Sequence, residues 1–175
     1  YLFGTETIEA IAVDGANRKW VGTFSSGLFQ ISADGQEQLN AFNTDNSPML
    51  NNKVSDIAII PSTGEVFIAS ENGLVSYRSD ATSSSEELTD VRIFPNPIKP
   101  DYNGLIAISN LTADATVRIT TINGDLVFET ISLGGQATWN RNNLSGQRVA
   151  SGVYLVHVST STASAGVTKK ILFLD

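Results

Sequence analysis

The sequence contains no cysteine, one histidine and one methionine among its 175 residues. Without cysteine the chain forms neither disulfides nor thiolate metal sites, and it has no thiol nucleophile. The single histidine, His157, lacks the partners that a zinc site or a Ser-His pair requires, so we expect it to be a structural or surface residue. These absences exclude the commonest metal and nucleophile chemistries. We therefore assign no catalytic, metal-binding or cofactor-binding residue and predict that the chain is not an enzyme.

Carboxylates do not form a convincing chemical site either. A pair of carboxylates can in principle catalyse glycoside hydrolysis, but Glu86 and Glu87 lie in a polar stretch where we expect them to be solvated. Residues 43–47 approach the alternating oxygen ligands of a calcium loop, but they also fit an ordinary loop of the repeat described below. The aspartates fall at turns, where aspartate hydrogen-bonds its own backbone; they are Asp14, Asp34, Asp45, Asp56 and Asp80.

Long hydrophobic runs are missing as well. No apolar run reaches the roughly 18–20 residues of a membrane helix, so we predict no membrane-spanning segment. The net charge of −7 argues against a nucleic-acid partner. Residues 1–90 carry 13 acidic and 4 basic residues, a net charge of −9, whereas residues 91–175 carry 5 and 7, a net charge of +2. This asymmetry suggests two units with different surfaces.

Helical periodicity is scarce, and short strands take its place. Apolar residues recur at every second position or in short runs, and Gly, Asn, Asp, Ser and Pro clusters interrupt them. This pattern predicts an all-β fold. The chain begins at Tyr1 without a methionine, so we expect it to be a piece of a longer parent.

A repeat of 46 residues occupies the first half. "IEAIAVDGANRKWVGTFSSGLFQI" from Ile8 aligns without a gap on "VSDIAIIPSTGEVFIASENGLVSY" from Val54. Each copy predicts three strands, with a glycine turn before the third. A period of about 40–50 residues with three or four strands is typical of a propeller blade. Two blades cannot close a propeller, so we expect further blades before Tyr1 and exposed edges that pair with other chains.

The second half has a different texture. Residues 79–90, "SDATSSSEELTD", are predicted to be a linker between blades at 1–78 and a second domain at 91–175. Pro95, Pro97 and Pro100 lie near the start of the second domain and predict an extended segment at its edge, because proline lacks the N–H that a central strand needs. The Asn123-Gly124 dipeptide predicts a hairpin with a type I′ turn. About seven short strands over 91–175 predict an immunoglobulin-like sandwich, which the apolar terminal segment "KKILFLD" helps to close.

Both halves resemble known families. "WVGTFSSGL" at residues 20–28 resembles the two-component regulator propeller repeat, although the second copy keeps only Gly73-Leu74. The second half resembles the C-terminal sorting domain of type IX secretion substrates in Gram-negative bacteria. The residues that carry this resemblance are Phe94, Pro95, Asn96 and Pro97 in "FPNP", Gly124 in "TTINGDLV", Gly152 and Tyr154 in "SGVYLVHV", and Lys169, Lys170, Ile171, Leu172, Phe173 and Leu174 in "KKILFL".

The combined resemblance implies a non-enzymatic surface component of the type IX secretion system. Its C-terminal domain would act as a sorting and interaction signal, carried by residues 169–174. It would partner the outer-membrane machinery and the surface sortase, and help deliver anionic lipopolysaccharide at the extracellular face of the outer membrane. Basic residues of the second half are candidate contacts to such an anion, although they also suit a solvated face; they are Arg92, Lys99, Arg141 and Arg148.

Several alternatives stay open. The protein is alternatively a secreted propeller adhesin or carbohydrate-binding cargo whose sorting domain is cleaved, or an enzyme with its site in further blades. "KKILFLD" is alternatively a core strand without a sorting role. Trp20 and Trp139 are expected in the core, although Trp139 also suits stacking on a sugar.

Overall fold

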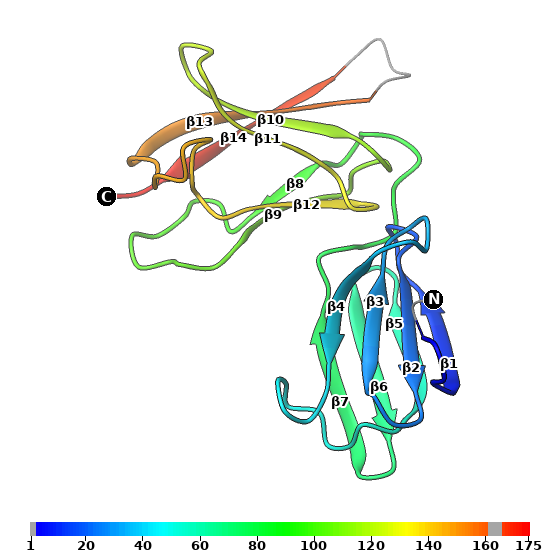
Figure 1. Ribbon diagram of the computed structural model, residues 1–175. Helices are drawn as coiled ribbons and strands as arrows, with labels where there is room; N and C mark the ends of the chain where they lie inside the picture. Colours follow the sequence, from blue (N-terminus) through cyan, green and yellow to red (C-terminus); the bar gives the residue numbers. More distant parts are fainter. Residues whose placement is uncertain (1–2, 161–165) are drawn as a thin grey trace. The chain divides into compact units, whose positions relative to one another are not determined.

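The chain forms two all-β units in a computed structural model, which describes residues 3–160 and 166–175 (Figure 1). The units are Tyr1–Ser83 and Ser84–Asp175. Every regular element of the described residues is a β-strand. The predicted all-β fold, with propeller blades followed by a sandwich, is confirmed.

The first unit contains two antiparallel sheets, which are the two propeller blades. The first sheet has the order β1-β2-β3-β4 and the second has the order β5-β6-β7. The strands are β1 (Ile8–Val13), β2 (Lys19–Thr23), β3 (Leu28–Ile31), β4 (Gln38–Phe42), β5 (Val54–Ile60), β6 (Glu65–Ser70) and β7 (Gly73–Arg78).

The repeat is visible in the strand positions. β1 and β5 begin at Ile8 and Val54, which are 46 residues apart, and so are the starts of β2 and β6. Gly27 and Gly73 both have positive φ, +93° and +136°, which glycine adopts without a Cβ penalty. The repeat did not predict β4. Its first three residues are exposed, so it lacks the alternation of apolar side chains that indicates a strand.

The core of the first unit lies between the two sheets. Trp20 is fully buried and stacks on Phe42 with ring centroids 6.1 Å apart. The ring of Tyr77 lies 5.7 Å from Trp20 and 5.1 Å from Phe42. The expected core position of Trp20 is confirmed. The other buried members are Leu28, Met49, Val54, Ile57, Val66 and Ile68.

The second unit is a sandwich of two antiparallel sheets. One has the order β11-β10-β13-β14 and the other has the order β12-β9-β8. One core of buried apolar side chains fills the space between them. The strands are β8 (Arg92–Phe94), β9 (Ile106–Ser109), β10 (Thr116–Thr121), β11 (Leu126–Ile131), β12 (Gln136–Trp139), β13 (Gly152–Ser159) and β14 (Val167–Phe173).

The β10–β11 hairpin is present as predicted, but the prediction of a type I′ turn was wrong. Gly124 N–H donates to the Thr121 carbonyl over 3.1 Å, and Thr121 N–H donates to the Asp125 carbonyl over 2.9 Å. Gly124 has a φ of +95°, whereas Asn123 is not among the residues with positive φ. A type I′ turn needs positive φ at two consecutive residues. The loop is instead a three-residue turn that ends in a glycine with left-handed conformation.

The predicted linker is more ordered than its composition suggests. Ser79, Ala81 and Thr82 are buried within the first unit, and Ser83 N–H donates to the Pro61 carbonyl over 2.8 Å. Within the second unit, Leu88 packs against the sandwich core. The side chains of this segment are small, so its backbone can lie close to the first unit. Its buried polar groups can then be satisfied by hydrogen bonds.

Candidate functional site

The last strand of the sandwich presents two different faces. In β14, Ile171 is fully buried and Phe173 is 2% exposed, so both belong to the core. Leu172 and Leu174 are each 38% exposed. This alternation follows from the two-residue period of a strand. β14 is therefore a core strand that also displays apolar side chains to solvent.

The lysine pair of the expected signal is divided between these faces. Lys170 is exposed and, by alternation, lies on the side of Leu172 and Leu174. Lys169 is half-buried and lies on the side of Ile171. The outward surface at the end of β14 is thus formed by Lys170 and Leu172 of the strand and by Leu174, which directly follows it. We call these three residues the outer face of β14.

Aromatic rings hold β14 from the core side. The ring of Phe173 lies 5.5 Å from both Trp139 and Tyr154 in edge-on geometry. Trp139 is 1% exposed, which confirms its expected core position, and its indole N–H donates to the Asn142 carbonyl over 2.7 Å. Gly152 begins β13 opposite Phe173. The motifs of Tyr154 and Phe173, which lie on the consecutive paired strands β13 and β14, therefore meet in one cluster.

The "FPNP" motif covers the other edge of β14. The side chain of Asn96 donates to the Lys170 carbonyl over 2.9 Å and accepts from Leu172 N–H over 3.1 Å. Ile98 N–H donates to the Leu172 carbonyl, and Leu174 N–H donates to the Ile98 carbonyl, over 2.8 and 2.9 Å. Sequence reasoning placed this motif at a domain edge but missed its attachment to β14. No local pattern signals a pairing between segments so distant in sequence.

Phe94, Pro95 and Pro97 remain near the surface beside this attachment. Phe94 ends the edge strand β8 and is 75% exposed. Pro95 and Pro97 line a shallow pocket with Lys99 and residues 101–103. Gly124, by contrast, lies in the β10–β11 turn and does not join the terminal strand. The structure thus brings together most of the expected motif residues, but not all of them.

The four candidate anion contacts have different surroundings. Arg92 is exposed and forms a 2.6 Å ion pair with Asp90, and the hydrogen bond from Arg92 lowers the pKa of the Asp90 carboxyl. Lys99 lines the shallow pocket. Arg148 is exposed and donates to the Asn103 side chain and the Tyr102 carbonyl, over 2.9 and 3.0 Å. The fourth, Arg141, is 8% exposed, and burial lowers the pKa of its guanidinium.

His157 occupies the solvent side of β13. Its two ring nitrogens lie 3.1 Å from the Thr120 hydroxyl and 3.0 Å from the Thr168 hydroxyl. These neighbours tie three adjacent strands together, which supports the expected structural role. In the described part of the chain, no three His, Cys, Asp or Glu side chains are grouped so that they could hold a metal ion.

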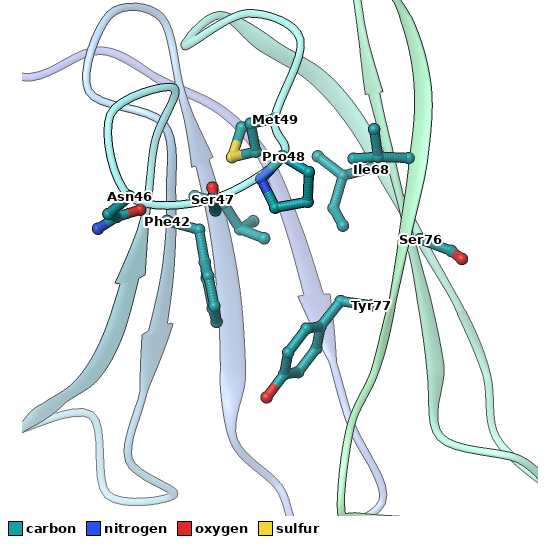
Figure 2. Close-up of a pocket in the computed structure, with 10 residues that line it drawn as sticks. Phe42, Asn46, Ser47, Pro48, Met49, Ile68, Ser76 and Tyr77 are labelled. Atoms are coloured by element: carbon teal, nitrogen blue, oxygen red, sulfur yellow. The ribbon is translucent and has the colours of Figure 1, made fainter.

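An apolar pocket of about 240 Å³ lies between the two blades of the first unit. Figure 2 shows the rings of Phe42 and Tyr77 at this pocket, with Pro48 and Met49 above them. Residues 43–47, the weak calcium candidate, form part of the adjacent loop. The Asn43 carboxamide oxygen there accepts from the backbone N–H groups of Asp45 and Asn46. The loop thus uses this oxygen to stabilise its own turn.

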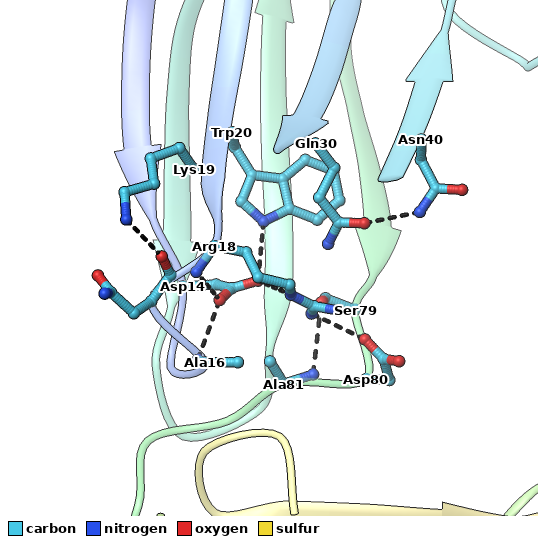
Figure 3. A network of polar contacts seen from close by, with 11 residues as sticks. Asp14, Ala16, Arg18, Lys19, Trp20, Gln30, Asn40, Ser79, Asp80 and Ala81 are labelled. Atoms are coloured by element: carbon cyan, nitrogen blue, oxygen red, sulfur yellow. Dashed lines mark hydrogen bonds and ion pairs between the residues drawn. The ribbon is translucent and has the colours of Figure 1, made fainter. Parts of the chain in front are cut away.

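A buried polar network fixes the end of the first unit (Figure 3). The Asp14 carboxylate accepts from Arg18 Nε over 2.8 Å and from the Trp20 indole over 3.1 Å. It also accepts from the backbone N–H of Ala16, the turn role expected from sequence. Arg18 reaches Ser79 and Asp80 over 2.9 and 2.8 Å. The ion pair between Arg18 and Asp80 was not predicted, since 62 residues separate them.

In the residues that the structure describes, no helix is both long and apolar enough to cross a membrane.

Comparisons with known proteins agree with these features. Residues 92–173 match the family described as secretion system C-terminal sorting domain. PorZ, an essential bacterial surface component of the type IX secretion system of Porphyromonas gingivalis, has a solved structure that is 33% identical over 97% of this chain. That match covers 23% of the PorZ chain, with a TM-score of 0.64. No curated protein matches the chain.

Two further solved structures are less similar. Dimeric latent PorU from Porphyromonas gingivalis is 17% identical over 63% of this chain and 12% of its own, with a TM-score of 0.37. The extracellular domain of a putative one-component system from B. thetaiotaomicron is 16% identical over 98% of this chain and 26% of its own, with a TM-score of 0.35. Residues 92–173 therefore belong to the family of secretion system C-terminal sorting domains, and the chain is PorZ-like, with that domain following two propeller blades.

Proposed function

We propose that the chain is part of a non-enzymatic cell-surface component of the type IX secretion system. Its sorting domain would serve as the export signal and as an interaction surface. A secretion sorting domain directs its protein out of the cell, so this chain is part of an exported protein. The observation that carries the proposal is the outer face of β14. It presents Lys170, Leu172 and Leu174 to solvent on a strand anchored from the core and from the edge.

The proposed partners are the outer-membrane secretion machinery and the surface sortase. Similarity to PorZ, which its structure report describes as a surface component of that system, supports this assignment. Help with delivering anionic lipopolysaccharide to the sortase is the finer part of the proposal. The net charge of +2 on residues 91–175 favours an anionic ligand for this domain over the blades, which are acidic. The domain would act at the extracellular face of the outer membrane.

The test changes the outer face of β14 without touching the core. Leu172→Ser with Leu174→Ser removes two exposed apolar side chains and keeps Ile171 and Phe173. Produced in the full-length parent in cells, this variant is expected to accumulate in the periplasm as a folded protein. Fractionation and surface labelling locate the protein, and protease resistance reports its fold.

Ile131→Ser is the matched control, because Ile131 is 58% exposed on β11 at the opposite edge of the same sheet. This variant should reach the surface normally. If the Leu172/Leu174 variant is also displayed at wild-type levels, the terminal strand is only a core strand and the proposal fails.

One observation favours the cargo alternative. Ser83, Ser84, Glu86, Glu87, Thr89 and Asp90 are exposed, so this stretch is accessible to a processing protease. Mass spectrometry of protein isolated from cells separates the two functions. Retention of Asp175 supports the secretion component, whereas a C-terminus between residues 83 and 90 supports cleaved cargo.

A further inference from the structure

In the described chain, the second blade has one strand fewer than the first. In the first blade, β3 pairs with β2 on one side and with β4 on the other, where Leu28 and Gln30 lie opposite Phe42 and Asn40. In the second blade, β7 pairs with β6, and no described strand lies on its other side. The outer edge of β7 is therefore an unpaired sheet edge, which is a template for pairing with a further strand.

The residues that correspond to β4 in the repeat belong to the second unit. A shift of 46 residues places the counterpart of β4 at 84–88. Ser85 N–H donates to the Leu111 carbonyl over 2.7 Å, and Leu88 packs against the sandwich core. Every other described strand already belongs to a sheet. The chain has no strand of its own to complete the second blade, so an added strand comes from a different polypeptide.

The backbone of β7 is oriented to accept such a strand. Ser79 N–H, directly after β7, points toward the β6 side and donates to the Gly64 carbonyl over 2.9 Å. The direction of the backbone groups alternates along an antiparallel strand. Those of Leu74, Ser76 and Arg78 therefore point away from β6. These N–H and C=O groups form the outer edge of β7.

Two glycines show how much space lies beside this edge. Gly27 and Gly73 are equivalent in the repeat. A Cβ at Gly27 would lie 2.2 Å from the carbonyl oxygen of Phe42, which ends β4. A Cβ at Gly73 would meet only the side chain of Leu50 within 4 Å. The backbone of a further strand therefore has room at the start of β7.

The apolar pocket of about 240 Å³ lies beside the same edge. Val75, Ser76 and Tyr77 of β7 line it, together with Phe42 and residues 46–49 of the first blade. In Figure 2, the Tyr77 ring points from β7 toward Phe42, whereas the Ser76 side chain points away. Cross-strand partners share one face of a sheet, so a residue opposite Val75 would face the pocket. The volume lies below the roughly 300–1,000 Å³ of small-ligand sites and suits one apolar side chain.

We propose that the outer edge of β7 binds an extended segment of a different polypeptide, which pairs antiparallel with β7 and places an apolar side chain in the pocket beside Val75 and Tyr77. In this mode of recognition, backbone hydrogen bonds give affinity and the pocket gives specificity. Residues 1–83 carry 10 acidic and 4 basic residues, a net charge of −6, which favours a segment that carries lysine or arginine. The proposal goes beyond the proposed function and does not rest on it.

The probe is a synthetic peptide of residues 38–44, "QLNAFNT", with one lysine added at each end. The fluorescein-labelled peptide is titrated with the 175-residue chain, and its anisotropy reports binding. The peptide should bind saturably. In hydrogen exchange, it should protect the amides of Leu74 and Ser76, whereas that of Val75, which points toward β6, should change little.

Two changes in the peptide separate the edge from the pocket. By the register of β3 and β4, Ala41 of the peptide lies opposite Val75 and Asn40 lies opposite Ser76. Ala41→Leu in the peptide should tighten binding about tenfold, because a larger apolar side chain enters the pocket. Asn40→Pro in the peptide should weaken binding at least about tenfold, because proline removes an N–H that pairs with β7.

Ser76→Pro and Ser76→Ala are the matched variants of the chain. Proline removes the outward N–H of β7 and is tolerated at a sheet edge. Alanine keeps this N–H and removes only a side chain that points away from the pocket. Ser76→Pro should weaken binding of the peptide at least about tenfold, whereas Ser76→Ala should bind it like wild type. Thermal unfolding checks that both variants are folded.

Five results would overturn the proposal. Three of them are the absence of saturable binding, equal binding by Ser76→Pro and Ser76→Ala, and no gain from the leucine peptide. The fourth is binding to the 175-residue chain but not to the full-length parent, which would show that the parent covers the edge itself. The fifth is sedimentation that shifts toward the monomer in Ser76→Pro alone, which would assign the edge to a second copy.

The peptide titration and the sorting assay test different parts of the chain. The β7 edge lies in the first unit, whereas the sorting assay changes Leu172 and Leu174 in the second. Failure of the titration therefore leaves the sorting role unaffected, and failure of the sorting assay leaves the peptide site standing.

Discussion

At the scale of single residues, a cluster of aromatic rings packs beneath β14. Phe173 is 2% exposed and contacts Trp139, Tyr154 and the Arg141 guanidinium. Ring pairs of this kind contribute about 0.5–1.5 kcal/mol beyond the area that they bury. The neighbouring Leu172 has none of these ring contacts. Of these two adjacent residues, Phe173 is therefore part of the packed core, whereas Leu172 is part of the exposed surface.

Phe173→Ala is therefore expected to lower the free energy of unfolding of the sorting domain by about 3–5 kcal/mol, because it leaves a cavity among the rings. Urea unfolding followed by the indole NMR signal of Trp139 measures the change. Leu172→Ala, at an exposed position of the same strand, should change stability by less than about 0.5 kcal/mol. Similar losses in both variants would contradict this difference between core and surface.

At the scale of secondary-structure elements, the period of the side chains was predictable and the contacts between distant segments were not. The two-residue period along β13 accounts for the burial of Val156 and Val158 and for the position of His157 on the opposite face. The positions of β1 and β5 followed from the repeat. The attachment of Asn96 to Lys170 spans 74 residues, so no local pattern could indicate it. Arg141 was assigned by its charge alone, because burial depends on what packs around it.

The attachment of Asn96 should make the edge of β14 locally stable. Asn96→Ala removes two hydrogen bonds to β14, which are each worth about 0.5–1.5 kcal/mol. Hydrogen exchange of the Leu172 amide should therefore become about tenfold faster, while that of the Val156 amide in the centre of the sheet should change little. Asn103→Ala, which does not contact β14, is the control. Unchanged exchange at Leu172 in the Asn96 variant would show that the edge is held by Ile98 alone.

At the scale of the whole molecule, the first blade has an apolar face that nothing covers in the described chain. Ile11 and Val13 on β1 are 61% and 54% exposed. In the repeat they correspond to Ile57 and Ile59 on β5, which pack toward the first blade. The apolar surface by which β5 packs against the first blade is therefore repeated on β1, where it is exposed. This exposed surface of β1 has the character of a contact with another blade.

This face should make the 175-residue chain self-associate. Ile11→Ser combined with Val13→Ser is expected to shift its sedimentation toward the monomer, because an exposed apolar patch is removed. Ile122→Ser, at a turn residue that is 68% exposed, is the control and should leave association unchanged. Analytical ultracentrifugation at several concentrations distinguishes the variants. Identical sedimentation of all of them would show that the face does not drive association.

The accessible stretch between the blades and the sandwich should be the first site of proteolysis. Glu86 and Glu87 are both exposed there. A glutamate-specific protease is expected to cut at these residues and release two resistant fragments, since other glutamates lie in or beside strands. Mass spectrometry over time identifies the cut. Glu86→Gln with Glu87→Gln should delay it, and an earlier cut within either unit would contradict the expectation.

The place of β14 in the chain order also sets a time at which the sorting domain can fold. Ile171 and Phe173 complete a core whose other strands are all synthesised earlier. A ribosome that has made β8 to β13 has made every other strand of the sandwich but not β14, which completes the core. The nascent domain therefore stays open through most of its synthesis. A polypeptide that lacks Ile171 and Phe173 has neither the strand that closes the core nor the outer face of β14, so under the proposed sorting role a single truncation removes the fold and the signal together.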